Sequence, residues 1–129
     1  MPTIKNNIST LSTIADKFFE QQDEIILLNV CTSDGFNLYS KTIDENFIEE
    51  DKISAIASSL GSLANSSSKL ITGHDAIVTT IESDGGHVVF QRSTLKDQPI
   101  VVAIATNPKL SLAHVRFFLK KVADTIENI

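Results

Sequence analysis

The chain has 129 residues, of which 42% are hydrophobic, and 16 acidic against 11 basic residues give it a net charge of −5. This length predicts one domain, residues 1–129, and no apolar run is long enough for a membrane-spanning helix. No basic stripe is present, which argues against nucleic acids and anionic membranes as partners. The N-terminal segment lacks a secretory signal, so a cytoplasmic protein is expected.

The first third of the chain predicts a helix followed by a β-hairpin. Over residues 3–21, apolar residues recur at steps of three and four, as on one face of an α-helix: Ile4, Ile8, Leu11, Ala15 and Phe18. The runs EIILLNVC and FNLYSKTI are strand-like, and Asp34-Gly35 between them is typical of a tight turn. Cys31, in the first run, is expected to be a small buried residue rather than a reactive thiol.

A second amphipathic helix is predicted over residues 51–67. Glu49, Glu50 and Asp51 would lie at the positive end of its dipole, which is a favourable placement. Helical spacing assigns six apolar residues to its buried face: Ile53, Ile56, Ala57, Leu60, Leu63 and Ala64.

Three strands and a helix are predicted in the last part of the chain. The strands lie in DAIVTTIES, HVVFQRS and PIVVAIAT, with turns at DGG and TLKDQ. The third run is almost wholly apolar, as in a central strand that is covered on both faces. Ser111 is predicted to cap the last helix, whose buried face would comprise Leu112, Val115, Leu119, Val122 and Ile126.

The order α-β-β-α-β-β-β-α predicts an α+β fold with a single five-stranded antiparallel sheet. Strands joined by tight hairpins are antiparallel neighbours. The first and third helices are expected on one face of the sheet and the second helix on the other. No internal repeat or linker divides the chain.

No residues form a recognisable catalytic, cofactor-binding or metal-binding motif. The five glycines are not arranged in a phosphate-binding loop, and no Gly-x-Ser-x-Gly elbow occurs. The histidines His74, His87 and His114 lack the spacing of a helical metal pair. His74-Asp75 could orient an imidazole for base catalysis, but a loop dipeptide is the favoured interpretation. We therefore expect neither an enzyme nor a bound cofactor or metal.

The second helix carries unusually small side chains outside its apolar stripe. No charged residue lies between Lys52 and Lys69, although an exposed helix face normally carries several. Small, neutral side chains allow close helix packing and lower the desolvation cost of covering the surface. A solvent-facing, serine-rich helix is the alternative. The favoured prediction is a partner-binding surface made of Ser54, Ala55, Ser58, Ser59, Gly61, Ser62 and Asn65.

The strand in DAIVTTIES is predicted to be an edge strand. It follows a crossover and starts a hairpin, and its alternating row has no charge before Glu82. Such an edge pairs readily with its own copy across a two-fold axis. The predicted dimer edge therefore consists of Ile77, Thr79 and Ile81.

The chain resembles the Roadblock family of dynein-light-chain-like proteins and bacterial regulators of Ras-like GTPases. The resemblance covers about residues 8–126 and includes the order of elements, the hairpin ILLNVCTSDGFNLYSK and the small-residue helix DKISAIASSLGSLANSSSKLI. It extends to the strand PIVVAIAT with the helix LSLAHVRFFLKKVADTI. The resemblance implies a profilin-like sandwich that forms a homodimer, or a heterodimer with a homologous subunit.

The same resemblance implies that the paired second helices form a platform for a small Ras-like GTPase. Some family members accelerate GTP hydrolysis, but this chain has only two arginines, Arg92 and Arg116, that could serve as an arginine finger. The leading hypothesis is a non-enzymatic dimeric adaptor or regulator that binds a small Ras-like GTPase through the second helix, with an effect on GTP hydrolysis left open. The alternatives are a general dimeric scaffold and a PAS-like small-molecule sensor. A sensor requires a polar-lined cavity between sheet and helix, whereas the apolar pattern predicts a filled core.

Overall fold

The computed structural model describes residues 2–43 and 49–129. Its elements follow the predicted order, and their bounds are α1 (Pro2–Gln21), β1 (Ile25–Thr32), β2 (Asn37–Thr42), α2 (Glu50–Thr72), β3 (Val78–Ser83), β4 (Gly86–Leu95), β5 (Gln98–Thr106) and α3 (Leu112–Glu127). Ile4, which was predicted on the inner face of the first helix, has a side chain that lies outside the described part of the structure. Among the described residues, no helix combines the length and the apolar character that a bilayer crossing requires.

The strands form one antiparallel sheet in the order β2-β1-β5-β4-β3. The apolar strand β5 is central, as predicted, and β3 lies at an edge. In the register of the sheet, Leu28 of β1 is opposite Ile104, and His87 of β4 is opposite Thr106. Alternate residues of β5 therefore face opposite layers of the molecule.

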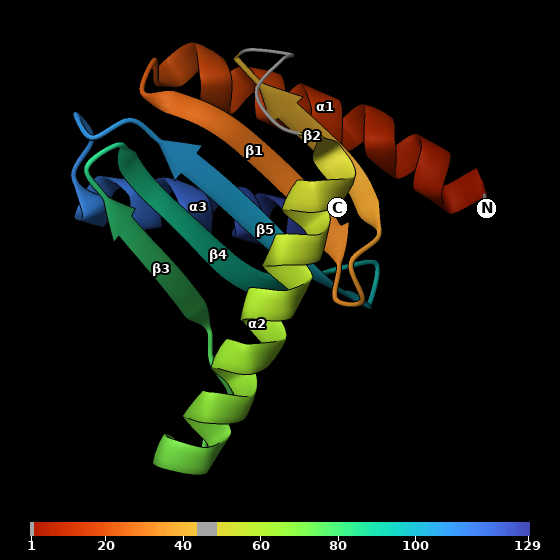
Figure 1. Ribbon diagram of the computed structural model, residues 1–129. Helices are drawn as coiled ribbons and strands as arrows, with labels where there is room; N and C mark the ends of the chain where they lie inside the picture. Colours follow the sequence, from red (N-terminus) through yellow and green to blue (C-terminus); the bar gives the residue numbers. More distant parts are fainter. Residues whose placement is uncertain (1, 44–48) are drawn as a thin grey trace.

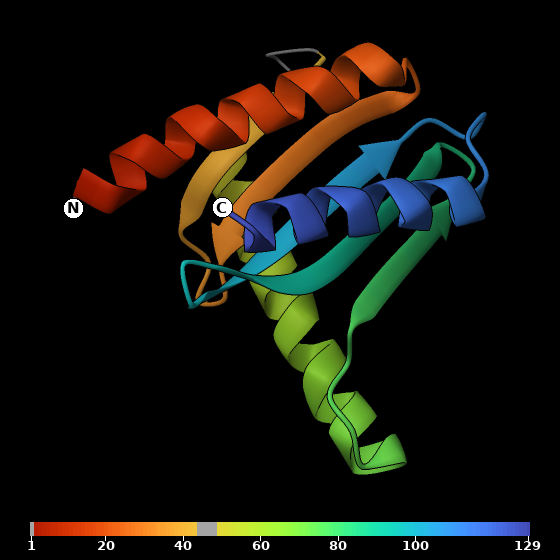
Figure 2. The ribbon, with the colours of Figure 1, turned by 180° about the vertical axis from the view of Figure 1, so that it is seen from behind.

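The sheet has helices on both faces, which confirms the predicted layers. Figure 1 shows α2 crossing one face, and Figure 2 shows α1 and α3 on the other. The larger core lies between the sheet and the α1–α3 pair and includes Leu11, Val30, Val102, Leu119 and Ile126. The core under α2 is smaller and consists of two clusters, with Ala57 in one and Ile53 in the other.

The α2 helix is longer than predicted. It continues through the serines at 66–68 to Thr72, and Gly73 ends it in the left-handed conformation, with φ of +77° and its N–H bonded to the Lys69 carbonyl. Serine weakens a helix without ending it, whereas glycine adopts positive φ at no steric cost. The C-terminal part of α2 consequently projects beyond the sheet (Figure 1).

The last helix begins as predicted. The hydroxyl of Ser111 accepts a hydrogen bond from the backbone N–H of His114 at 3.3 Å. Val115, Leu119, Val122 and Ile126 are all buried, while Leu112 is half-buried. The periodicity of the sequence therefore places the inner face of α3 correctly.

Candidate protein-interaction surface

Small residues of α2 allow the helix to lie close to the sheet. Ser54 and Ala57 are fully buried, and a Cβ added to Gly61 would lie 3.9 Å from Val101 Cγ2. The thiol of Cys31 contacts the Ser54 carbonyl oxygen at 3.8 Å. These positions therefore support the chain's own packing rather than an exposed surface.

Two more of the predicted partner-binding residues form hydrogen bonds within the chain. Ser58 Oγ donates to the Ser33 carbonyl at 2.8 Å, and Asn65 Oδ1 accepts from the Ala76 N–H at 2.9 Å. The row Ser54, Ser58, Gly61 and Asn65, predicted to face outward, thus faces the sheet and its loops. The outward placement of Ser54 was wrong, because its small side chain is buried where α2 lies close to the sheet, while Ser58, Gly61 and Asn65 are half-buried.

The opposite side of α2 is open and carries no charged residue between Lys52 and Lys69. Ala55, Ser59 and Ser62 are exposed, and so are residues that were assigned to the buried face. Ile56 is 46% exposed, Leu63 65% and Leu70 88%. The assignment of Ile56 and Leu63 to the core was therefore wrong, because the helix rests on its small side chains and projects past the sheet. We call Ala55, Ile56, Ser59, Ser62, Leu63 and Leu70 the outer face of α2.

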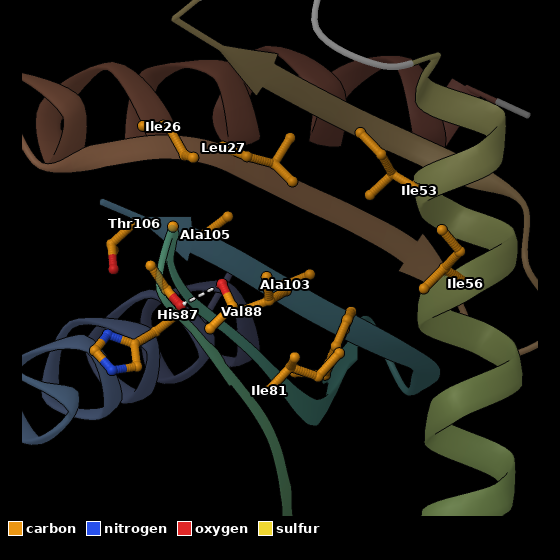
Figure 3. Close-up of a pocket in the computed structure, with 14 residues that line it drawn as sticks. Ile26, Leu27, Ile53, Ile56, Ile81, His87, Val88, Ala103, Ala105 and Thr106 are labelled. Atoms are coloured by element: carbon orange, nitrogen blue, oxygen red, sulfur yellow. Dashed lines mark hydrogen bonds between the residues drawn. The ribbon is translucent and has the colours of Figure 1, made fainter. Parts of the chain in front are cut away.

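An apolar hollow lies beside α2 on the same face of the sheet (Figure 3). Its volume is about 320 Å³, and its lining is nearly all apolar. Val88, Ala103 and Ala105 form part of its floor, while Ile53 and Ile56 approach from α2 and Ile81 from β3. The expectation of a filled core is therefore correct on the α1–α3 face and wrong on the α2 face.

The hollow is continuous with the β3 edge of the sheet. Ile77 is 70% exposed and Ile81 40% exposed, while Thr79 is half-buried. Ile81 and Thr79 pair with Val88 and Phe90, which face α2. The free edge, the hollow and the outer face of α2 therefore form one largely apolar surface, which is flanked by Lys69 of α2 and Glu82 of β3.

Of the residues considered for chemistry, His87 lines the hollow, and the others lie apart from this surface or are buried in the core. His74 is exposed in the loop after α2, and its carbonyl accepts a hydrogen bond from Ser68 Oγ at 2.8 Å. Lys69 donates to Asp75 at 3.2 Å and thereby lowers the pKa of that carboxyl group. Burial raises the pKa of the Cys31 thiol to about 11. Asp75 is thus bound to a lysine, and Cys31 is a protonated core residue.

Comparison with solved structures places this surface on a known fold. MglB from Myxococcus xanthus is 14% identical, with a TM-score of 0.80 over 94% of this chain and 87% of that one. The gliding protein MglB from Thermus thermophilus is 8% identical, with a TM-score of 0.81 over 95% and 89%. A Roadblock/LC7 domain from Streptomyces avermitilis is 15% identical, with a TM-score of 0.74 over 88% and 91%. The chain has the Roadblock/LC7 fold.

This Roadblock/LC7 fold is supported by three-dimensional structure rather than by sequence similarity. No protein-family model matches the sequence, and no curated protein matches it. Sequence periodicity identified the helices and the edge strand of the fold. Sequence periodicity did not predict the hollow. Alternation in β4 and β5 indicates which residues face the α2 side of the sheet, but it does not indicate whether another element covers these residues.

Proposed function

We propose that this chain is a non-enzymatic, cytoplasmic adaptor that forms a dimer and binds a small Ras-like GTPase through α2. The observation that carries the proposal is the outer face of α2, which has no charged residue between Lys52 and Lys69 and exposes Ile56, Leu63 and Leu70. Isolated exposed apolar residues are ordinary, but a continuous patch beside an apolar hollow is typical of an interaction surface. Its Roadblock/LC7 fold adds support.

The dimer would use the β3 edge together with the hollow. Strand β3 has unpaired backbone groups along one side, and the described residues next to it lack a covering element. A second copy, or a homologous subunit, that pairs with this edge would bring its own α2 over the neighbouring hollow. Leu63 and Leu70 would then leave water, at about 1.5–3 kcal/mol for each fully buried side chain.

The GTPase would contact the part of α2 that such a dimer leaves open. The outermost positions on the helix are Ala55, Ser59 and Ser62, on the side away from the sheet. Short neutral side chains allow a second backbone to approach closely and carry no strongly bound hydration shell. Ser54, Ser58, Gly61 and Asn65 would support this surface from below, through the contacts described above.

The experiment is a pull-down with a Ras-like GTPase encoded in the same genome, loaded with a non-hydrolysable GTP analogue. The double variant Ser59→Arg, Ser62→Arg places two long charged side chains on the contact, and we expect at least about tenfold weaker binding. Ser9→Arg, on the exposed side of α1, is the matched control and should bind as the wild type does.

Equal GTPase binding by the double variant and the control would overturn the assignment of this surface. Phosphate release measured in the same mixtures shows whether the bound GTPase also hydrolyses GTP faster. If the chain dimerises but captures no GTPase of the organism, the result favours a general dimeric scaffold without GTPase binding.

A second candidate function, a small-molecule sensor, is favoured only by the hollow. Its volume of about 320 Å³ is at the lower end of the range of ligand sites. Its lining is nearly all apolar, and Ser83, His87 and Thr106 are its polar side chains. A ligand site normally orients its ligand with a few well-placed polar groups. A rise in the melting temperature with a metabolite, in a chain whose hollow is not occupied by a second copy, would favour the sensor over the adaptor.

A further inference from the structure

The face of the sheet opposite the hollow carries a second surface of different character. From residue 98 to residue 123 the sequence contains no aspartate or glutamate, although the whole chain is acidic. This segment holds four basic residues, Lys109, Arg116, Lys120 and Lys121. Three of them lie on α3 and are exposed, and none forms an ion pair within the described part of the chain.

A groove lies between α3 and the β3 edge on this face. Its volume is about 500 Å³, and it is lined by Ile77, Val78, Gln91, Ala113, Arg116, Phe117, Leu119 and Lys120. The groove exists because α3 packs over β4 and β5 and leaves the outer side of β3 uncovered (Figure 2). Its walls are therefore a regular helix on one side and an edge strand on the other.

Apolar and basic groups converge in this groove. Phe117 is 56% exposed and Ile77 is 70% exposed, so both can contact an incoming side chain. The Lys121 ammonium lies 5.0 Å from the centre of the Phe117 ring, which holds the ring beside a positive charge. Arg116 and Lys120 stand one helical turn apart on the same wall. Asp124 and Glu127 enter only in the last turns of α3.

We propose that this groove binds an acidic peptide segment that carries apolar side chains. Complementary charge would select the acidic residues and orient the segment, while Phe117 and Ile77 would receive its apolar side chains. A concave groove suits an extended segment better than a flat bilayer. Three basic side chains on α3 are also fewer than the clusters of about 4–8 that are typical of anionic-lipid binding. The groove is separate from the outer face of α2, so this inference does not rest on GTPase binding, although Ile77 belongs both to the groove and to the proposed dimer edge.

The test uses fluorescence anisotropy with a dye-labelled synthetic peptide in which glutamate alternates with leucine and phenylalanine. We expect saturable binding by the full chain that weakens as salt is added, because the contact is partly electrostatic. A peptide with lysine in place of glutamate is the matched probe and should not bind. Vesicles of phosphatidylcholine with and without phosphatidylserine are measured in parallel.

Two variants and a control complete the test. Arg116→Glu with Lys120→Glu should weaken peptide binding at least about tenfold, and Phe117→Ala should weaken it to a smaller extent. Lys17→Glu, an equal change of charge per site on α1, should have little effect because α1 lies on the opposite side of α3 from β3. Circular dichroism and light scattering establish that fold and oligomeric state are unchanged.

The inference is overturned if the acidic peptide does not bind, if the lysine peptide binds equally, or if the α3 variants bind as the wild type does. Binding of phosphatidylserine vesicles through Arg116 and Lys120, without peptide binding, would also overturn it and assign the surface to a membrane. Loss of GTPase binding with peptide binding retained would affect only the proposed function of α2.

Discussion

Asn29 illustrates how single side chains hold the α2 face together. It is fully buried on β1, and its Nδ2 donates to Asn37 Oδ1 at 3.0 Å and to Ser40 Oγ at 2.7 Å on β2. The same group approaches Ser54 Oγ at 3.3 Å, which joins the hairpin to α2. Burial of an amide N–H group is costly unless it is hydrogen-bonded, so these contacts of Nδ2 fix the start of α2 over the β1–β2 hairpin, although Asn29 Oδ1 is buried without a hydrogen-bond partner in the described part of the chain.

At Gly86 the backbone leaves no room for a side chain. Its φ is +137°, and an added Cβ would lie 1.9 Å from the carbonyl oxygen of Thr106. We expect Gly86→Ala to lower the free energy of unfolding by about 2–4 kcal/mol, from backbone strain and the displacement of β5. Gly85→Ala is the matched control, since its Cβ would meet only Ser83 Oγ at 3.7 Å. Urea denaturation of both variants measures the difference, and equal stabilities would contradict this reading of the turn.

The Cys31 thiol should be unreactive in the folded chain. Desolvation by burial is the main cause of its raised pKa of about 11, and the charge of Asp34 adds to it. At about pH 8 the thiol is therefore protonated, and Ellman's reagent should label it only after unfolding. Labelling of the native chain at the rate of a free cysteine would contradict this.

The same raised pKa predicts a loss of stability in alkaline solution. The pKa in the folded state lies above the ordinary value of 9.0, so the folded chain binds this proton more tightly than the unfolded chain does. The contribution of Cys31 is therefore fully present below about pH 9 and decreases as the pH rises toward about 11. Comparison of the pH dependence of urea unfolding with that of Cys31→Ala separates this effect from the titration of lysine and tyrosine.

At the scale of single elements, α2 has one side that packs on the sheet and another side that is exposed. Ser54, Ala57 and Gly61 form a narrow contact line on the sheet, and the helix projects beyond it with Leu70 and Ile71, which are 88% and 80% exposed. An isolated helix end with such residues would be poorly solvated. The edge strand β3 offers an apolar contact for such a helix end, because Ile81 of β3 lines the hollow.

These two elements lead to a prediction about the dimer. Leu63→Glu with Leu70→Glu should shift the chain toward monomer and weaken dimerisation at least about 100-fold, since each change acts twice across a two-fold axis. Both positions are exposed in the single chain, so its fold should be unaffected. Light scattering and sedimentation equilibrium measure the change.

The control for the dimer prediction is Phe36→Glu. Phe36 is also exposed, at 69%, but it lies in the β1–β2 turn, away from β3 and the hollow. This variant should dimerise normally. A wild-type chain that is monomeric at all concentrations, or a double variant that dimerises as well as the control does, would refute the proposed interface.

At the scale of the whole molecule, the two faces of the sheet differ in kind. On one face, α1 and α3 pack on the sheet over a large apolar core. The segment 98–123, which includes most of α3, contains basic residues and no acidic residue. The α2 face is only partly covered and carries neutral, apolar surface. An acidic chain with a local basic groove has a strongly uneven field, which favours binding of oppositely charged segments on that side alone. The proposed GTPase contact on α2 and the proposed peptide groove beside α3 can therefore be tested independently, whereas the proposed dimer edge shares Ile77 with that groove.

The sequence by itself determined the elements, their order and the central and edge strands. Periods of about 3.6 and 2 residues report which side of an element is apolar, and the Asp34-Gly35 turn and the Ser111 cap depend on neighbouring residues alone. The same local rules correctly predicted the inner face of α3 and placed Leu11, Ala15 and Phe18 of α1 inward, whereas Ile8, also predicted inward, is 38% exposed.

Only the tertiary structure decided which of the small and apolar residues of α2 are exposed. Periodicity assigned Ile56 and Leu63 inward and Ser54 outward, and the structure has both reversed. The reason is that burial depends on the angle and distance at which a helix crosses the sheet, and these are set by contacts such as Ser58 with Ser33 and Asn29 with Ser54, between residues far apart in the chain. The hollow and the α3 groove likewise arise from the incomplete cover of one layer by another.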